Sequence, residues 1–197
     1  MAQILQSLLK TVIAGVVLLI IILLVETSIS GTSIPFSHAW GTFVMRWLHV
    51  ASGVMWIGLL WYFNFVQIPS MPNIPDEQKP AISKVIAPTA LFWFRYAALA
   101  TVITGLLVAW MQGYLMMALT LQPGVVAIGL GMWIALIMAF NVWFIIWPNQ
   151  KKALGIVTVE APEKAKAARV AMLTSRVNTM LSISMLYMMV AQQNAGL

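Results

Sequence analysis

The sequence predicts an all-α integral membrane protein with five transmembrane helices. Of its 197 residues, 61% are hydrophobic and only 8% are charged, and the mean hydropathy is +0.92. A soluble domain of this size carries about 25% charged residues. Several apolar runs also reach the ~20 residues that a helix needs to cross the ~30 Å hydrocarbon core of a bilayer. Composition and run length therefore place the chain in a lipid bilayer.

The expected spans follow the apolar runs in order. The first covers about Leu9 to Ile29, and its length and lack of a small-residue cleavage site favour a retained anchor over a removed signal peptide. Pro148 is expected to end the fourth span. We expect an anchor helix with its outer connector over residues 1–37 and a bundle of four helices over residues 38–197. The bundle's expected spans are Thr42 to Val66, Thr89 to Met111, Val125 to Trp147 and, after a first helical turn at Pro162 and Glu163, Val177 to Gln192.

The lysines and arginines predict how the chain is oriented in the membrane. Basic residues concentrate on the cytoplasmic side of membrane proteins. When the chain crosses five times, Arg46 is the one basic residue that falls on the opposite side from all the others. The N-terminus is therefore expected to be cytoplasmic and the C-terminus periplasmic. Because the net charge of +6 is spread over loops and not over one continuous face, the sequence argues against a nucleic-acid partner.

Several kinds of chemistry are excluded or disfavoured. The chain has no cysteine, which excludes disulfides, covalently attached c-type haem and iron–sulfur clusters. It has no phosphate-binding glycine loop, dinucleotide fingerprint or serine nucleophile elbow. Glu26 is the only acid in any expected span. The sequence therefore does not resemble a proton pump or a secondary transporter, which place carboxylates or broken helices in the membrane.

Three residues of the second expected span form the sharpest candidate site. Arg46 and His49 are three residues apart and share one helical face, and Gly53 lies one turn beyond His49. An imidazole can bind haem iron, a small residue beside it leaves room for the porphyrin, and an arginine nearer the membrane surface can pair with a propionate. The spacing therefore makes Arg46, His49 and Gly53 candidates for binding haem b, with His49 as the iron ligand.

A structural explanation stays open for the same residues, and the second haem ligand is undefined. A lone histidine in a membrane span can hydrogen-bond to a neighbouring helix, glycines often serve close packing, and Arg46 can pair with Glu26. The other histidine, His38, could fold back toward His49, bind a surface metal, or simply be solvated. Methionines of the last helix could ligate iron or serve as flexible packing; they are Met180, Met185, Met188 and Met189.

A second group of polar side chains is expected at a similar depth near the cytoplasmic ends of the helices. Asparagine and arginine at such positions commonly lock helices together through interhelical hydrogen bonds. They can also line a pocket for an anionic or quinone-like ligand, although locking is the more common role. We call this group the inner polar cluster; it comprises Asn64, Arg95, Asn141, Arg176 and Asn178, with Gln67 one turn after Asn64.

Four segments resemble, in order, the membrane domain of the PuuD-type urate hydroxylase family. They are RWLHVASGVMWIGLLWYFNFVQ from Arg46, LFWFRYAALATVITGLL from Leu91, NVWFIIWPNQKKALG from Asn141 and AARVAMLTSRVNTMLSISMLYMMVA from Ala167. The likeness runs from about residue 40 to the end of the chain. The chain also resembles, more loosely, the HemJ-type protoporphyrinogen oxidases, which are haem-b membrane proteins. This second resemblance lies in the sequence motifs WLHV and WIG.

The resemblance implies a haem-binding electron-transfer function, with His49 as the candidate ligand and Arg95 at the basic position of the third helix. It also implies a bacterial inner membrane. The chain departs from the family pattern in lacking a cytochrome c portion and in having Phe92 where we expect a histidine. The leading hypothesis is an oxidase-like component that binds haem b and passes electrons to other membrane subunits or to a separate cytochrome c. The alternative is a non-catalytic accessory subunit of a larger respiratory or oxidase complex.

Overall fold

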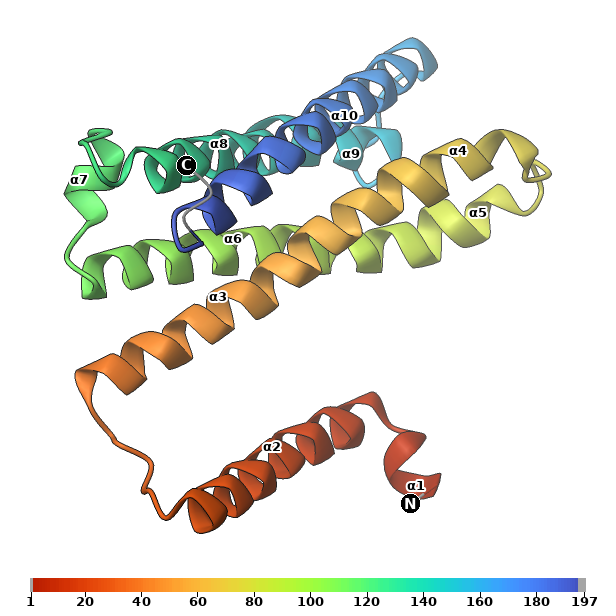
Figure 1. The fold of residues 1–197 in the computed structure, drawn as a ribbon. Helices are drawn as coiled ribbons and strands as arrows, with labels where there is room; N and C mark the ends of the chain where they lie inside the picture. Colours follow the sequence, from red (N-terminus) through yellow and green to blue (C-terminus); the bar gives the residue numbers. More distant parts are fainter. Residues whose placement is uncertain (1, 195–197) are drawn as a thin grey trace. The chain divides into compact units, whose positions relative to one another are not determined.

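The computed structural model describes residues 2–194 and divides the chain into two compact units, residues 1–41 and 42–197 (Figure 1). The described residues form helices and turns, with no β-strand among them. The first unit holds α1 (Ala2–Leu5) and α2 (Leu8–Ser30), and it ends within the first turn of α3. Gly31 ends α2 in the left-handed conformation that glycine adopts without strain. No residue of α2 is buried, which suits an anchor surrounded by lipid.

The second unit is a helical bundle formed by long helices whose ends are broken by short π-helical and 3₁₀ segments. The first long pass of the chain is α3 with its continuation η1 and α4. The chain then returns through α5, η3 and α6, and the short α7 follows. The third pass runs through α8, η4 and α9, and α10 is the last. The bounds are α3 His38–Trp61, η1 Tyr62–Gln67, α4 Ile68–Ser70, η2 Met71–Asn73, α5 Lys79–Ala81, η3 Ile82–Ile86, α6 Ala87–Met111, α7 Leu115–Leu119, α8 Val126–Phe140, η4 Asn141–Ile146, α9 Trp147–Ala153 and α10 Ala161–Ala191.

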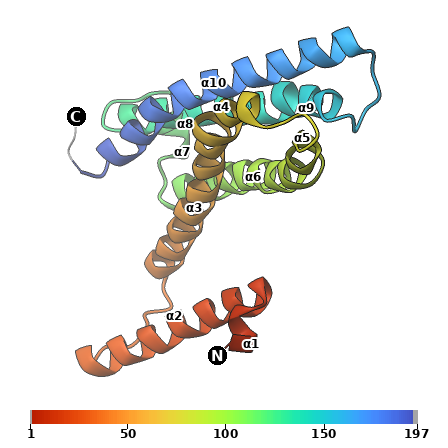
Figure 2. The ribbon, with the colours of Figure 1, turned by 90° about the vertical axis from the view of Figure 1, so that its right-hand side faces the viewer.

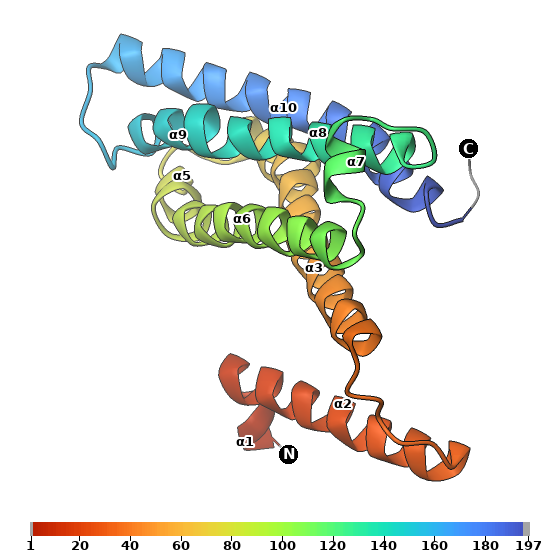
Figure 3. The ribbon, with the colours of Figure 1, turned by 90° about the vertical axis from the view of Figure 1, so that its left-hand side faces the viewer.

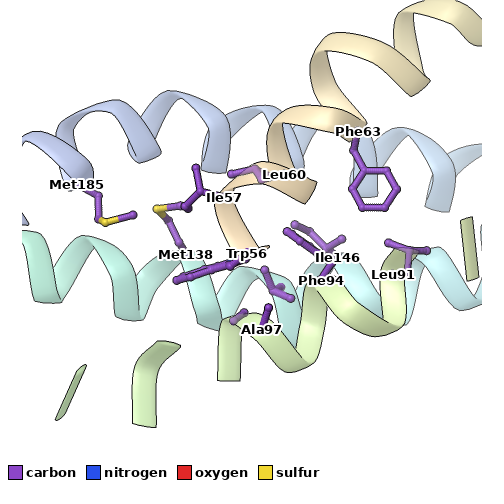
Figure 4. Packing of buried hydrophobic residues seen from close by; sticks show 12 residues of the cluster. Trp56, Ile57, Leu60, Phe63, Leu91, Phe94, Ala97, Met138, Ile146 and Met185 are labelled. Atoms are coloured by element: carbon purple, nitrogen blue, oxygen red, sulfur yellow. The ribbon is translucent and has the colours of Figure 1, made fainter. Parts of the chain in front are cut away.

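The helix α10 lies along α8, η4 and α9, and α6 contacts α8 and η4 as well (Figures 1 and 3). Figure 2 views the bundle from the end where the turn between α4 and α5 lies near α9. The main hydrophobic core joins α3, α6, α8 and α10 (Figure 4); Trp56, Leu60, Phe94 and Met138 are among its fully buried side chains. A smaller core lies under α7, where Ala118 packs against α8.

Three of the long helices change to π-helix immediately before a proline. Each π-segment ends directly before a residue that is followed by proline. The pairs are Ile68-Pro69 after η1, Ala87-Pro88 after η3 and Trp147-Pro148 after η4. Proline lacks an N–H and its ring clashes with the carbonyl four residues earlier. A π-turn widens that stretch of backbone. The helix therefore passes through each proline and does not end there.

Because η4 precedes Pro148, the predicted end of the fourth span is wrong. Pro148 does not stop the helix, which continues without a break from Val126 to Ala153. The second and third spans are likewise longer than expected, because they continue as helix to Asn73 and begin at Lys79. The extensions carry basic residues, among them Lys79, Lys84, Lys151 and Lys152, so the longer helices end in a positively charged region.

Within residues 2–194, four helices are long and apolar enough to cross a membrane, namely Leu8–Ser30, His38–Asn73, Lys79–Met111 and Val126–Ala153. They give the chain the make-up of a multi-span membrane protein. The expected fifth segment is also a helix, α10, but its mean hydropathy is lower. The main reason is its five charged residues, which are Glu163, Lys164, Lys166, Arg169 and Arg176. The helix also contains the buried polar residues Ser175, Asn178 and Ser182. The fifth crossing and the orientation of the termini stay predictions.

Candidate functional site

A cavity of about 560 Å³ lies between α3, α6, α8 and α10 in the second unit. Most of its wall is apolar, and its polar side chains include Arg46, His49, Tyr114 and Gln193. Cofactor and small-molecule sites commonly have volumes of about 300–1,000 Å³ and a few polar groups on an apolar wall. All three residues expected to bind haem, Arg46, His49 and Gly53, line this one cavity.

The imidazole of His49 is held across the helix interface by α6. Its Nδ1 atom lies 2.9 Å from the backbone carbonyl oxygen of Thr101, with the Thr104 hydroxyl 3.4 Å away. A carbonyl oxygen can only accept a hydrogen bond, so Nδ1 carries the proton and donates it. In the neutral ring the other nitrogen, Nε2, then has a free lone pair. This arrangement, with one ring nitrogen bonded to a backbone carbonyl, is the one that orients histidines as metal ligands.

Gly105 is what allows the His49 ring to reach that carbonyl. Gly105 lies one turn after Thr101 on α6, and a methyl group added there would come 2.7 Å from Cε1 and 3.0 Å from Nδ1 of His49. Even alanine would therefore displace the ring. Gly105 was not among the residues predicted from the sequence, where its only signal is a glycine in an apolar span four residues after a threonine. At Gly53 an added methyl group would meet only Thr101 Cγ2, at an ordinary 3.8 Å.

Arg46 and Tyr114 are two further polar residues of the cavity wall. The Nη1 atom of Arg46 donates a long hydrogen bond of 3.4 Å to Gln193 Oε1. Its Nε atom is buried and has no hydrogen-bond partner. Burial raises the pKa of the Tyr114 phenol, with the charge of Arg46 opposing the shift in part, so the hydroxyl keeps its proton near neutral pH. The guanidinium thus has an unused donor that an anionic group could accept.

Two further features of the cavity bear on the haem hypothesis. Trp56, two turns after His49, is fully buried, and its Nε1 donor has no acceptor. Sequence reasoning did not single it out. Of the methionines considered as ligands, Met185 and Met189 line the cavity. Met180 is exposed, and Met188 packs against Gly131 of α8.

His38 does not belong to the same compact unit as the cavity residues. It is the first residue of α3, belongs to the first unit, and its side chain is exposed. Among the residues that the structure describes there is no group of three or more histidine, aspartate or glutamate side chains placed to hold a metal ion. His49 is therefore the residue on which the haem hypothesis depends.

The inner polar cluster is mostly engaged in bonds between helices. Asn141 donates to the Oδ1 of Asn178 at 2.8 Å, and Asn178 donates to the Met138 carbonyl at 2.9 Å. Asn64 donates to Ser175 Oγ at 2.7 Å and to the Leu60 carbonyl at 2.9 Å. These bonds connect α10 to α8, η4 and η1, which is the locking arrangement. Two members differ: Arg176 is exposed, and Arg95 is buried against the ring of Trp147.

We expect Asn178→Ala to lower the free energy of unfolding by about 1–3 kcal/mol, because two hydrogen bonds are lost and the buried Asn141 amide loses its acceptor. Unfolding of the purified chain in mixed detergent micelles would measure this. The matched control is Asn149→Ala, since Asn149 donates only to the Ile145 carbonyl of its own turn. Equal effects of the two substitutions would show that the Asn141–Asn178 pair does not hold the helices together.

The second unit is thus a helical membrane bundle with an apolar cavity that contains one oriented histidine. Comparisons with known protein families, curated proteins and solved structures give no match for the chain.

Proposed function

We propose that the chain is a membrane-embedded electron-transfer protein that binds haem b through His49. One observation carries the proposal: the bond from Nδ1 to the Thr101 carbonyl leaves Nε2 as the ring nitrogen without a proton in a residue that lines the cavity. Only an unprotonated nitrogen can bind iron, and a fixed second nitrogen sets the orientation of the ring.

The remaining residues of the cavity fit a haem group. The volume of about 560 Å³ is within the range of cofactor sites. Arg46 has a buried Nε donor without an acceptor, which suits a propionate. Met185 and Met189 place thioether sulfurs on the cavity wall, and methionine is a known axial ligand of haem. Without cysteine in the chain, attachment has to be non-covalent.

The chain's own residues would bind and orient the group and exclude water. His49 would be fixed by Thr101 and given room by Gly105, and the apolar wall would keep water from the cavity. A bound haem b supplies transfer of one electron at a time. Tyr114, protonated near neutral pH, adds a hydroxyl donor at the rim beside Arg46. No carboxylate lines the cavity among the described residues, so His49 is its one side chain that could act as a base.

The resemblance of the four segments to urate hydroxylase membrane domains supports the same assignment and suggests a bacterial inner membrane. In this proposal α10 is the fifth transmembrane helix, the N-terminus is cytoplasmic, and the C-terminus is periplasmic. The redox partner would be a separate cytochrome c or another membrane subunit. The replacement of the family's expected histidine by Phe92, whose side chain is half-exposed on α6, argues against oxidation of urate by this chain alone.

The test is a dithionite-reduced minus oxidised spectrum of the full chain purified in mild detergent, with a pyridine haemochrome assay and identification of co-purifying subunits. A b-type signal with one haem per chain is the expected result. A haem-free protein that retains a constant set of partner subunits would reject the proposal and favour the accessory subunit.

Gly105→Ala should lower the haem content at least several-fold while the chain still inserts, because the new methyl group displaces the His49 ring from the Thr101 carbonyl. The haem-to-protein ratio after purification measures the effect. Gly15→Ala is the control, since no atom lies within 4 Å of the methyl group it adds to α2. Full haem occupancy in Gly105→Ala would mean that the observed orientation of His49 is not needed for binding.

A further inference from the structure

Arg95 is a buried cation that has no acidic partner in the described chain. Only 8% of its surface is exposed, its guanidinium carbon lies 3.4 Å from the centre of the Trp147 ring, and its Nη1 atom is buried without an acceptor. The acidic residues of the second unit form other ion pairs or are exposed to solvent. Asp76 pairs with Lys79 and Glu163 pairs with Lys152, whereas Glu77 and Glu160 are exposed. A charge buried in a membrane protein without a counter-ion is strongly unfavourable.

A second buried donor without an acceptor lies along the same contact between α6 and the η4–α9 segment. The ring of Trp143 meets the edge of Tyr96, the neighbour of Arg95, at a centroid distance of 5.7 Å, and the Nε1 atom of Trp143 has no acceptor. Trp143 lies one turn before Trp147, so both indoles contact this part of α6. The contact is formed by Arg95 and Tyr96 of α6 with Trp147 and Trp143. We call these four residues, together with Gln150 and Lys151 of α9, the α6–α9 seam.

The rest of the seam adds a cation and an acceptor. The Nζ atom of Lys151 lies 5.7 Å from the centre of the Trp147 ring. Gln150, one turn after Trp147, has a buried Oε1 atom that receives no hydrogen bond. Two buried donors, Arg95 Nη1 and Trp143 Nε1, therefore lack an acceptor, and the amide oxygen of Gln150 lacks a donor. Lys151 adds a second positive charge beside Trp147.

The position of the seam indicates where its ligand comes from. Figures 1 and 3 show that α9, the turn between α4 and α5, and the beginning of α10 lie at the same end of the bundle. This end carries Lys79, Lys84, Lys151, Lys152 and Lys164. Two aromatic side chains of these segments are exposed: 47% of Tyr96, which belongs to the seam, and 68% of Phe144, which follows Trp143 in η4, are accessible. Buried donors and positive charges next to exposed aromatic side chains match a phospholipid, which has an anionic head group and acyl chains.

We propose that the α6–α9 seam binds the head group of an anionic phospholipid that carries hydroxyl groups, such as phosphatidylglycerol. Arg95 and Lys151 face its phosphate, the Trp143 N–H donates to a phosphate oxygen, and Gln150 Oε1 accepts a hydrogen bond from a head-group hydroxyl. The acyl chains lie along Tyr96 and Phe144. Basic recesses between helices are known sites for anionic lipid head groups, and hydrogen bonds to charged groups are the strong ones. This site does not depend on haem binding.

Native mass spectrometry of the full chain in mild detergent, titrated with phosphatidylglycerol or with zwitterionic phosphatidylcholine, tests the proposal. Wild type should retain one phosphatidylglycerol in preference to phosphatidylcholine. Arg95→Gln should reduce that retention about tenfold, since a hydrogen bond to a charged group contributes about 1.5–3 kcal/mol. The matched control is Arg176→Gln, which removes the same charge from an exposed arginine in the middle of α10, and should retain the lipid. Lys151→Gln, at a half-buried position, should weaken retention even if Arg95→Gln fails to fold.

Three outcomes would overturn the proposal. The first is equal phosphatidylglycerol retention by wild type, Lys151→Gln and every folded form of Arg95→Gln. The second is full displacement of the lipid by millimolar inorganic phosphate, with the same Arg95 dependence, which would make the seam a site for a free anion. The third is a protein subunit whose retention requires Arg95 while lipid retention does not, which would assign the seam to a partner's carboxylate.

Discussion

His49→Ala should abolish the b-type absorption of the purified protein while leaving the chain inserted in the membrane. The substitution removes the one histidine of the cavity, and with it the nitrogen that Thr101 orients toward iron binding. Under the proposed function, haem content should fall to a residual level below about a tenth of that of wild type, because no other histidine lines the cavity. The pyridine haemochrome assay and the reduced minus oxidised spectrum measure the loss.

The matched control for this prediction is His38→Ala, which removes an exposed histidine of the first unit. It should leave the spectrum and the haem content unchanged. If His49→Ala retains a normal Soret band, His49 is not the ligand, and its bond to Thr101 is a contact between helices only. If His38→Ala loses the haem instead, the assignment of ligand would pass to the outer connector, as one of the sequence-based alternatives allowed.

Gly129→Ala should cause the largest loss of stability of any single methyl addition in the second unit, about 2–4 kcal/mol. An added Cβ would overlap the backbone carbonyl oxygen of Ala118 and lie 2.8 Å from Cδ2 of Leu121. Overpacking against flexible side chains typically costs about 1–3 kcal/mol, and here the obstacle is backbone. The small core under α7 would have to open, since Ala118 is fully buried there against α8.

Thermal unfolding in detergent would measure this effect, with Gly58→Ala as the control. Gly58 also lies within a long helix, but no atom lies within 4 Å of the methyl group added there. Its replacement should be neutral or stabilising by up to about 1 kcal/mol, because alanine favours helix over glycine. A Gly129→Ala protein as stable as wild type would mean that α7 moves aside easily and that the contact is not part of the rigid core.

The apolar runs located the four most hydrophobic helices because length and hydropathy alone decide whether a helix can cross a bilayer. The second and fourth spans were predicted to end too early, and the third was predicted to begin too late. Proline usually ends a helix, and sequence patterns do not reveal that a π-segment can precede it. The region expected as a loop around Pro69 and Pro88 is therefore largely helical up to Asn73 and again from Lys79.

In the candidate site, the contacts within one helix could be predicted from the sequence, and the contacts between helices could not. Arg46, His49 and Gly53 belong to one helix, so the 3.6-residue period was enough to place them together, and all three line the cavity. Thr101 and Gly105 come from a helix about 50 residues later. Which carbonyl faces His49 depends on how α3 and α6 are shifted along each other, and no single-helix pattern contains that shift.

The inner polar cluster illustrates how similar residues acquire different roles. Asn64, Asn141 and Asn178 were expected to join helices, and each donates or accepts a bond between helices. Arg95 and Arg176 could not be distinguished by depth alone. The structure buries Arg95 against Trp147 and leaves Arg176 exposed, because the two lie on differently directed faces of α6 and α10.

The three π-segments also determine which way the residues beyond them point. A π-turn contains one more residue than an α-turn, and one residue corresponds to about 100° of rotation around a helix axis. A helical wheel drawn from the start of each span therefore assigns the wrong face to everything after η1, η3 and η4. If the residues of η4 formed ordinary α-helix without any change in their number, Trp147, Gln150 and Lys151 would be rotated by about 100° relative to Arg95. The length of these segments, as much as their composition, directs the side chains at the basic end of the bundle.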